Sequence, residues 1–251
     1  MSIRVRDRIR ARGSAGGSGS TALSPCLYRL AHYWNMDETG GTRADGFDSR
    51  PLTEVYGTTG SDAGKRGNAA VFSPDNKSVL GCSSSPGLTI AGDFSISLWY
   101  QPQNGTQDYV LLKAAADWSS EEWAVATQSQ GDGFIGATFE IYGDGTWTDY
   151  AYQRKDSIPF TPGDWIHIVG QYDFANKEVW LFIDGVAAHD YDEHRFMTNG
   201  PWQPGLPFSV GNARDHSNQG ARGRVDEIAV NQARIDPTLL YNSGDGRFYV
   251  Y

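Results

Sequence analysis

The sequence has few cysteines and no long apolar run. Its 251 residues include two cysteines, Cys26 and Cys82, which are too few for a disulfide framework and match no metal-binding spacing. We expect both to be reduced in a cytoplasm, with one disulfide between them as the alternative. No stretch approaches 18 consecutive apolar residues, so we expect no membrane-spanning helix. The N-terminal residues also lack the apolar segment of a secretory signal.

Stretches rich in alanine, leucine, glutamate and lysine are scarce too, which argues against a helix bundle or a coiled coil. The chain instead has 30 glycines and 13% aromatic residues, a mixture typical of short strands joined by tight turns. Hydrophobic residues make up 39% of the chain and charged residues 20%, which is enough apolar material for a core. The length fits one large all-β domain or two small domains.

Positive charge is scarce outside the N-terminus. Residues 1–12 contain five arginines and one aspartate, a formal charge of +4, and because the whole chain carries −9, the remainder carries −13. The arginines are Arg4, Arg6, Arg8, Arg10 and Arg12. An acidic body binds nucleic acid poorly because phosphate contacts need positive charge, so we do not expect a nucleic-acid partner. The basic segment has the charge to contact an acidic protein or neighbouring copies of this chain.

Composition divides the chain into three segments. They are a basic arm over residues 1–12, a flexible Gly/Ser linker over 13–20 and one folded domain over 21–251. Within the arm, Ile3, Val5 and Ile9 alternate with the arginines. This period of two suits a strand that adds to the edge of a partner's sheet. A disordered basic tail is the alternative, and both interpretations stay open.

Apolar and aromatic runs recur at short spacing after the linker, with turn residues between them. The runs are 69–72, 78–82, 94–102, 109–113, 122–127, 134–142, 150–154, 165–172, 177–183, 208–211 and 223–230. Because no helical pattern separates them, they predict antiparallel strands in a sandwich or a barrel. The pair Asp184-Gly185 predicts a two-residue hairpin turn, and Asp236-Pro237 predicts the start of one short helical turn.

Six motifs in this order resemble the laminin-G-like, or concanavalin A-like lectin/glucanase, jelly-roll family. They are YWNMDE (33–38) followed by Gly41 and Asp45, GNAAVF (67–72), GDFSISLWYQP (92–102), GDWIHIV (163–169), VWLFIDG (179–185), and FSVG (208–211) followed by GRVDEI (223–228). The resemblance implies an all-β fold, a two-sheet antiparallel jelly-roll sandwich that here carries an extended N-terminal arm. Because this fold serves lectins, glycosidases, adhesion modules and virion proteins, function must be argued from the site.

The sequence does not carry the acidic set of a glycosidase. Glucanases of this fold place their carboxylates on one strand in a Glu-x-Asp-x-Glu-like spacing, because alternate residues share a face. Neither Glu121-Glu122 nor Glu140 has such a partner, and the closest set, Asp190, Asp192 and Glu193, lies in a polar, loop-like stretch. No Ser-His-Asp order, zinc-protease motif or P-loop was found. We therefore predict that the chain is not an enzyme, with glycoside hydrolysis as a minor alternative.

The resemblance also implies a calcium ion, since jelly rolls of this kind often hold one and hard cations take several oxygen ligands. The candidate ligands are Asp226 together with Asp37 and Asp45. In the alternative interpretation, Asp226 and Glu227 end a strand and pair with Arg222 or Arg224. No other cofactor is predicted.

Sugar binding needs exposed aromatic faces flanked by polar groups. The candidate glycan-binding residues, chosen because they lie in or beside polar or Gly/Pro-rich stretches, are Trp118, Trp147, Tyr150, Trp202, Arg214 and His216. By contrast, Trp99, Trp165 and Trp180 lie within strand patterns and are predicted to be core residues.

A basic arm, a Gly/Ser linker, no export signal and a fold used for surface display together predict a non-enzymatic virion protein of a bacteriophage. Such a protein is made in the host cytoplasm and decorates the capsid or the tail. Residues 1–20 would anchor it to other virion proteins or to copies of itself, while its lectin-like domain meets surface glycans. The alternative is a stand-alone carbohydrate-binding or adhesion module, extracellular or on a bacterial surface.

Overall fold

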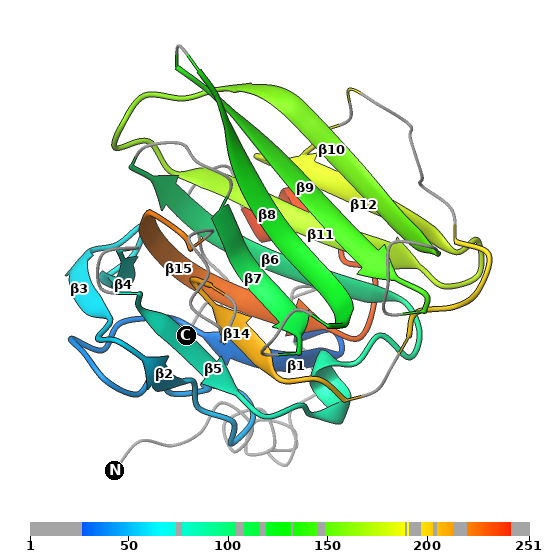
Figure 1. Cartoon of the computed structure of the whole chain (residues 1–251), viewed down its shortest axis with the longest axis horizontal. Helices are drawn as coiled ribbons and strands as arrows, with labels where there is room; N and C mark the ends of the chain where they lie inside the picture. The colour runs from blue at the N-terminus through cyan, green and yellow to red at the C-terminus, as the bar shows by residue number, and fades with distance from the viewer. Residues whose placement is uncertain are drawn as a thin grey trace, which may run out of the picture.

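The structure is a computed structural model that describes part of the chain. The described residues are 27–73, 77–103, 108–115, 119–131, 133–144, 149–188, 190, 197–202, 205–212 and 220–241. They form two antiparallel sheets packed face to face, with helical turns only at their margins (Figure 1). The predicted two-sheet, all-β sandwich is therefore confirmed. The arm and the linker lie outside the described residues.

One sheet has seven strands and stands in front in Figure 1. Its order is β10 (Tyr150–Pro159), β9 (Phe134–Tyr142), β8 (Glu121–Gly131), β7 (Asp108–Ala114), β14 (Phe208–Val210), β5 (Val79–Cys82) and β2 (Thr53–Tyr56). Strands β7 to β10 are neighbours in both sequence and space, so one continuous segment of chain builds half of this sheet.

The other sheet has eight strands. Its order is β13 (Val186–Ala187), β12 (Glu178–Ile183), β11 (Ile166–Asp173), β6 (Phe94–Pro102), β15 (Gly223–Asn231), β4 (Asn68–Phe72) and β3 (Gly60–Ala63), and β1 (Leu30–Trp34) also pairs with β15. The first half of β15 pairs with β4 and its second half with β1. The two helical turns are η3 (Pro86–Leu88) and α2 (Pro237–Tyr241).

The core lies between the sheets and comes from alternate residues of each strand, as the period of two predicts. Phe139 of β9 faces Gly170 of β11 across this core, and a Cβ at Gly170 would stand 2.4 Å from the Phe139 ring. Both positions are completely buried. Glycine at 170 therefore makes room for an aromatic ring from the opposite sheet, and this sets how closely the layers approach.

The local turn predictions are also confirmed. Asp184 and Gly185 have φ values of 51° and 79° and join β12 to β13, as a two-residue hairpin with two positive φ angles requires. The helical turn predicted after Asp236 is α2, and the Asp236 side chain accepts a hydrogen bond from the backbone N–H of Thr238 at 2.9 Å. This bond satisfies one of the N–H groups that a helix start leaves open.

The tryptophan predictions are only partly correct. Trp99 is buried, but it lies on the outer face of the eight-stranded sheet, where it stacks on Tyr241 of α2 at 5.7 Å between ring centroids. Trp165 and Trp180 are half-buried. The tryptophans that do fill the core between the sheets are Trp34 and Trp123. Outer-face aromatics share the period of core residues, so the pattern alone cannot separate the two faces.

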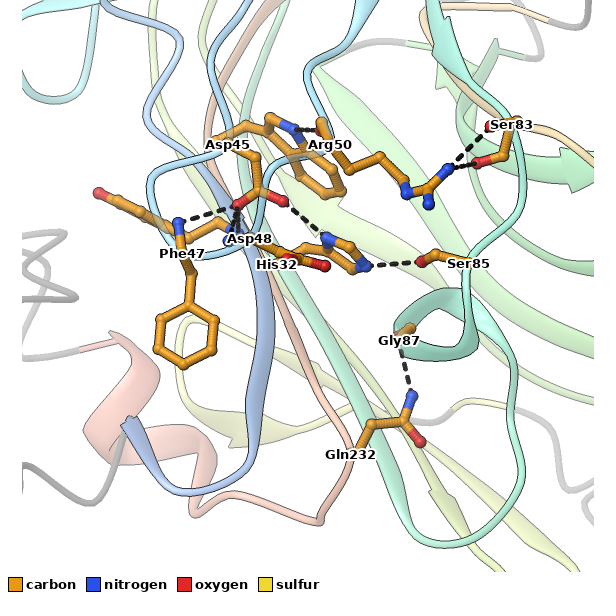
Figure 2. A network of polar contacts seen from close by, with 11 residues as sticks. His32, Asp45, Phe47, Asp48, Arg50, Ser83, Ser85, Gly87 and Gln232 are labelled. Carbon is orange, nitrogen blue, oxygen red and sulfur yellow. Dashed lines mark hydrogen bonds and ion pairs between the residues drawn. The ribbon is translucent and has the colours of Figure 1, made fainter. Parts of the chain in front are cut away.

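A polar network fixes β1 to the loops that flank it (Figure 2). His32 contacts Asp45 through Nδ1 and Ser85 through Nε2, both at 2.7 Å. The other carboxylate oxygen of Asp45 accepts backbone N–H groups of Tyr33, Phe47 and Asp48 at 3.0–3.1 Å. One aspartate thus orders an entire turn and the histidine beside it.

Two further sequence expectations concern membrane-spanning helices and the two cysteines. In the described residues, no helix is both long and apolar enough to span a bilayer. Cys82 is buried in β5, while Cys26 lies outside the described residues, so the predicted redox state of the pair is still a prediction.

The contact between Gly170 and Phe139 predicts the effect of a single methyl group. We expect Gly170→Ala to reduce the free energy of unfolding by about 2 kcal/mol, because the new Cβ overlaps a ring that has no room to move. Chemical denaturation monitored by fluorescence measures this difference. Gly92→Ala is the matched control, since a Cβ there meets nothing within 4 Å. Equal stability of the two variants would contradict the packing argument.

Candidate functional site

A groove of about 220 Å³ lies on the outer face of the seven-stranded sheet, over strands β7 to β10. Its lining combines aromatic rings with hydrogen-bonding groups, a combination typical of small-molecule binding sites. The lining residues are Tyr109, Ala126, Thr127, Gln128, Thr138, Glu140, Tyr150, Tyr152 and Arg154.

Strand alternation explains why these side chains face outward. On β9, the inward residues Ile135, Ala137, Phe139 and Ile141 belong to the core between the sheets. The residues between them, which include Thr138 and Glu140, therefore face the groove. The same alternation on β10 brings Tyr150, Tyr152 and Arg154 to the outer face. The groove thus lies on the outer face of the same strands whose inner face contributes to the core.

An irregularity in β8 brings a second carboxyl group to this face. Lys113 pairs with Trp123 and Ala114 pairs with Glu121, so Glu122 is an extra residue on β8. Ala114 belongs to the outer-face cluster, and Glu121, opposite it, shares that face. Glu122 faces inward, where it forms a buried ion pair with Lys113 and accepts the backbone N–H of Leu206 at 2.7 Å. A bulge of this kind re-aims adjacent side chains.

Glu121 and Glu140 interact across neighbouring strands. They are only 5% and 6% exposed, and the Tyr142 side chain lies close enough to both carboxyl groups to oppose part of the pKa shift that burial causes. Burial, together with the charge of Glu121, raises the pKa of Glu140 to about 8. Burial also raises the pKa of Glu121. One oxygen of each, Oε1 of Glu140 and Oε2 of Glu121, has no hydrogen-bond partner among the described residues.

Tyrosine rings from β10 and from β7, which are separated by β8 and β9, line the groove. The Tyr150 ring stacks on Tyr142 at 6.1 Å and on Tyr152 at 5.6 Å between centroids, and the planes of Tyr150 and Tyr152 differ by 5°. Both Tyr150 and Tyr152 are half-buried, so part of each ring is open to a ligand. Tyr109 on β7 adds a third ring to the lining. Tyr109 is only 5% exposed, whereas the flat, partly exposed rings of Tyr150 and Tyr152 suit the apolar face of a sugar.

Arg154 is the only cation among the groove-lining residues. Its guanidinium donates to Gln128 Oε1 at 3.2 Å and forms an ion pair with Asp156. Asp156, on the same strand, thereby balances the charge of Arg154. Glu140, which forms the floor of the groove, has no cation paired with it from Arg154.

The structure places two of the predicted glycan-binding residues. Tyr150 lines the groove. Trp202 is half-buried, donates its backbone N–H to the Tyr142 carbonyl at 2.8 Å and does not line the groove. The other four, Trp118, Trp147, Arg214 and His216, lie outside the described residues, as do Asp192 and Glu193. Asp190, from the same acidic stretch, pairs with Lys155 at 2.5 Å.

The three predicted metal ligands do not converge on one point. Asp37 and Asp226 meet at the turn between β3 and β4: Asp37 accepts the Asn68 N–H at 2.9 Å, and Asp226 accepts the N–H groups of Arg66 and Glu227 at 3.0 and 2.9 Å. Asp45 belongs instead to the His32 network. Among the described residues no three His, Cys, Asp or Glu side chains form a metal-binding group. Calcium therefore stays a prediction.

The alternative pairing proposed for Asp226 is wrong for Arg224. Arg224 forms its ion pair with Asp62, while Asp226 is fully buried. Burial raises the pKa of Asp226 to about 8 and that of Glu227 to about 7, and the nearby Asp37 charge adds to both shifts. Glu227 accepts the Tyr33 hydroxyl. The charge of Arg66 opposes part of the rise in the pKa of Glu227.

The chain contains a Ser-His-Asp arrangement that the sequence did not reveal. Ser85, His32 and Asp45 have the residue types and contact order of a hydrolytic triad. However, Ser85 is 6% exposed and His32 is 1% exposed, so the serine hydroxyl is covered by neighbouring residues. The arrangement is consequently assigned to stability, as part of the network in Figure 2.

Comparison with known families places this fold. A family model described as the concanavalin A-like lectin/glucanases superfamily matches residues 67–237. The chain belongs to the concanavalin A-like lectin/glucanases superfamily. The matched segment includes all four strands beneath the groove. No curated protein matches the sequence of this member of the superfamily.

Solved structures from the superfamily fold resemble the chain at low sequence identity. One is domain 4 of AbnA, a GH43 extracellular arabinanase from Geobacillus stearothermophilus, in complex with arabinotriose. It has a TM-score of 0.57 and 20% identity, over 87% of this chain and 98% of that domain. Another is the binding domain of Paraclostridial Mosquitocidal Protein 1, with a TM-score of 0.63 and 14% identity, over 86% of this chain and 52% of that one.

A third similar structure is the sialidase of Trypanosoma rangeli. Its TM-score is 0.61 at 10% identity, and the match covers 86% of this chain and 33% of the sialidase. The present chain therefore spans about half of the mosquitocidal binding domain and one third of the sialidase. At these identities the comparisons show a common fold and nothing more.

The cluster at Glu140 predicts a measurable pH dependence. Because the pKa of Glu140 rises from 4.5 to about 8 on folding, its contribution to stability is complete below pH 4.5 and is lost as the pH rises through 8. We expect the melting temperature to fall between pH 5 and pH 8, and to fall less in Glu140→Gln. Asp62→Asn, which removes an exposed carboxyl of the other sheet, is the control. Identical slopes for Glu140→Gln and the wild type would contradict the assignment.

Proposed function

We propose that this member of the superfamily is a non-enzymatic glycan-binding protein that holds saccharides in the groove over β7 to β10. The observation that carries the proposal is the lining itself, which combines three tyrosine rings with acceptors and donors from Gln128, Thr138, Glu140 and Arg154. Sugars have apolar ring faces and polar edges, so they need stacking surfaces and hydrogen bonds together.

The position of the groove supports this proposal. Its lining residues stand on neighbouring strands of a sheet whose other side is the core. A site on rigid strands loses little conformational entropy when a ligand binds. The structural match covers 98% of the domain of the Geobacillus arabinanase, and that domain was solved with arabinotriose. That ligand belongs to that protein, and it motivates saccharides as the first class to test.

The arrangement of the carboxyl groups favours binding over hydrolysis. A glycosidase needs two carboxyl groups that flank the scissile bond, one as the acid and the other as the nucleophile or base. Here Glu140 lines the groove, whereas Glu121, on the same face of the sheet, is 5% exposed and is not among the lining residues. One carboxyl group that faces the ligand suits recognition. Reducing ends released from a bound polysaccharide, and absent with Glu140→Gln, would overturn the non-enzymatic part of the proposal.

Screening the full chain on a glycan array, once with calcium and once with EDTA, tests the proposal directly. We expect binding to at least one saccharide and a loss of about tenfold in affinity for Tyr152→Ala, since each aromatic contact contributes about 1 kcal/mol or more. Phe174→Ala is the matched control because this ring is 47% exposed on the β11–β12 turn, outside the groove lining. Unchanged binding by Tyr152→Ala, with an unchanged melting temperature, would place the site elsewhere.

The virion role predicted from the sequence is proposed as the biological setting of this groove. It rests on the +4 charge of residues 1–12 against −13 in the remainder, which favours docking of the arm on neighbouring acidic bodies. In that setting the arm binds virion proteins or other copies of the chain, and the groove faces outward toward surface glycans. An extracellular or cell-surface adhesion module is the alternative setting for the same groove.

Light scattering can separate these settings. We expect the full chain to form a defined oligomer at low salt and a chain that starts at Thr21 to be monomeric, because removal of the arm removes the attractive charge. Glycan binding should be the same in both, since the groove lies within the folded domain. Monomers in both samples would contradict self-assembly through the arm.

A further inference from the structure

We infer that the groove selects saccharides that carry a free amino group, whose ammonium ion binds between the groove tyrosines and the unpartnered oxygen of Glu140. This inference rests on the proposed glycan-binding function and names its ligand class. The ligand is thus an amino sugar that has not been acetylated, in place of a neutral or an acidic saccharide.

The first argument is the unused hydrogen-bonding capacity at the groove floor. Oε1 of Glu140 is buried and has no partner among the described residues, and the side chain as a whole is 6% exposed and lines the groove. Buried carboxyl oxygens are rarely left without a donor, because the cost of removing them from water is then uncompensated. A ligand group at this point would supply the missing donor.

The second argument is charge. Glu140 and Glu121 lie close enough for their charges to repel each other when both are ionised, and the nearby Tyr142 side chain supplies no positive charge. Two cations of the strands beneath the groove are committed elsewhere: Arg154 pairs with Asp156, and Lys113 pairs with Glu122 on the inward side of the sheet. This part of the molecule therefore lacks one positive charge.

An ammonium group supplies both the missing hydrogen-bond donor and the missing positive charge, whereas a hydroxyl supplies only the donor. A sugar hydroxyl donates one hydrogen bond but brings no charge, so the carboxyl pair keeps its proton. An ammonium group has three donors and a full positive charge, and hydrogen bonds between charged groups are about twice as strong as neutral ones. It can take the place of the proton that the buried carboxyl pair otherwise retains.

The tyrosines favour the same ligand. Tyr109, Tyr150 and Tyr152 line the groove beside Glu140, and the faces of aromatic rings attract cations that have lost part of their hydration. The charge of −13 on the chain outside the arm adds a long-range attraction for cationic ligands. An acidic saccharide meets repulsion from both sources.

The experiment compares matched sugars on the full chain in EDTA at neutral pH. Glucosamine, galactosamine and mannosamine are each titrated beside the N-acetylated form and the parent hexose, by calorimetry or ligand-observed NMR. We expect at least one free amine to bind about tenfold or more tightly than both of its partners, the ratio that one charged hydrogen bond provides.

Two variants identify the group responsible. Glu140→Gln keeps the shape of the side chain and removes its charge, so it should reduce the amine-to-acetyl ratio to about one while the protein stays folded. Asp62→Asn also removes one carboxylate, but from the outer edge of the other sheet, and it should keep the full preference. A preference that survives in Glu140→Gln would overturn the inference.

The results also separate this inference from the proposed function. If no free amine binds better than its partners while the array shows neutral glycans bound through Tyr152, the amine preference is wrong and glycan binding stands. If neither experiment shows saccharide binding, both are wrong. Amine preference that is lost in Tyr152→Ala and in Glu140→Gln supports both together.

Discussion

The close contact of Phe139 with Gly170 is the constraint on which the rest of the structure depends. It brings the two sheets together in the middle of the core and thereby decides which residues of β9 point inward. Once Phe139 is inside, Glu140 must be outside, because successive strand residues face opposite ways. The core thus determines the site: a shift of β9 by one residue would bury Glu140 between the sheets and remove the groove floor.

Much of the fold could be predicted because it follows from local patterns. Alternation of apolar residues marks most of the strands, and Asp184-Gly185 marks its turn through backbone conformation alone.

The groove is harder to predict from the sequence than the fold. The sequence predicts Tyr150 as a binding residue, but it does not single out Glu140, which has no acidic partner two residues away on the same strand. Its partner, Glu121, is on the neighbouring strand, and only the pairing register and the bulge at Glu122 bring the two together. Neither can be read from local spacing.

The same reasoning explains the metal and triad assignments. Asp37 and Asp226 lie at the same turn, yet Asp45, which the resemblance groups with them, is held by His32 and by three backbone N–H groups. Conversely, Ser85 joined His32 and Asp45 although nothing in the sequence linked them. Long-range polar contacts depend on how loops cross the ends of the sandwich, and loop paths have no periodic signature. Burial then decides their role, which for Ser85 is structural.

The attachment of β1 has a mechanical consequence. Any pull on the N-terminal segment enters the domain at β1, which lies beside β15 and is held there by backbone pairing over Leu30–Trp34. The His32 network fastens the same strand to the loop at Asp45 and to the start of η3 (Figure 2). A pulling force on β1 is therefore shared among β15, the loop at Asp45 and the start of η3 before it reaches the core. Strands β7 to β10, which carry the groove, do not contact β1 through this network. A force applied ahead of β1 would therefore reach the groove only after passing through β1, β15 and the core.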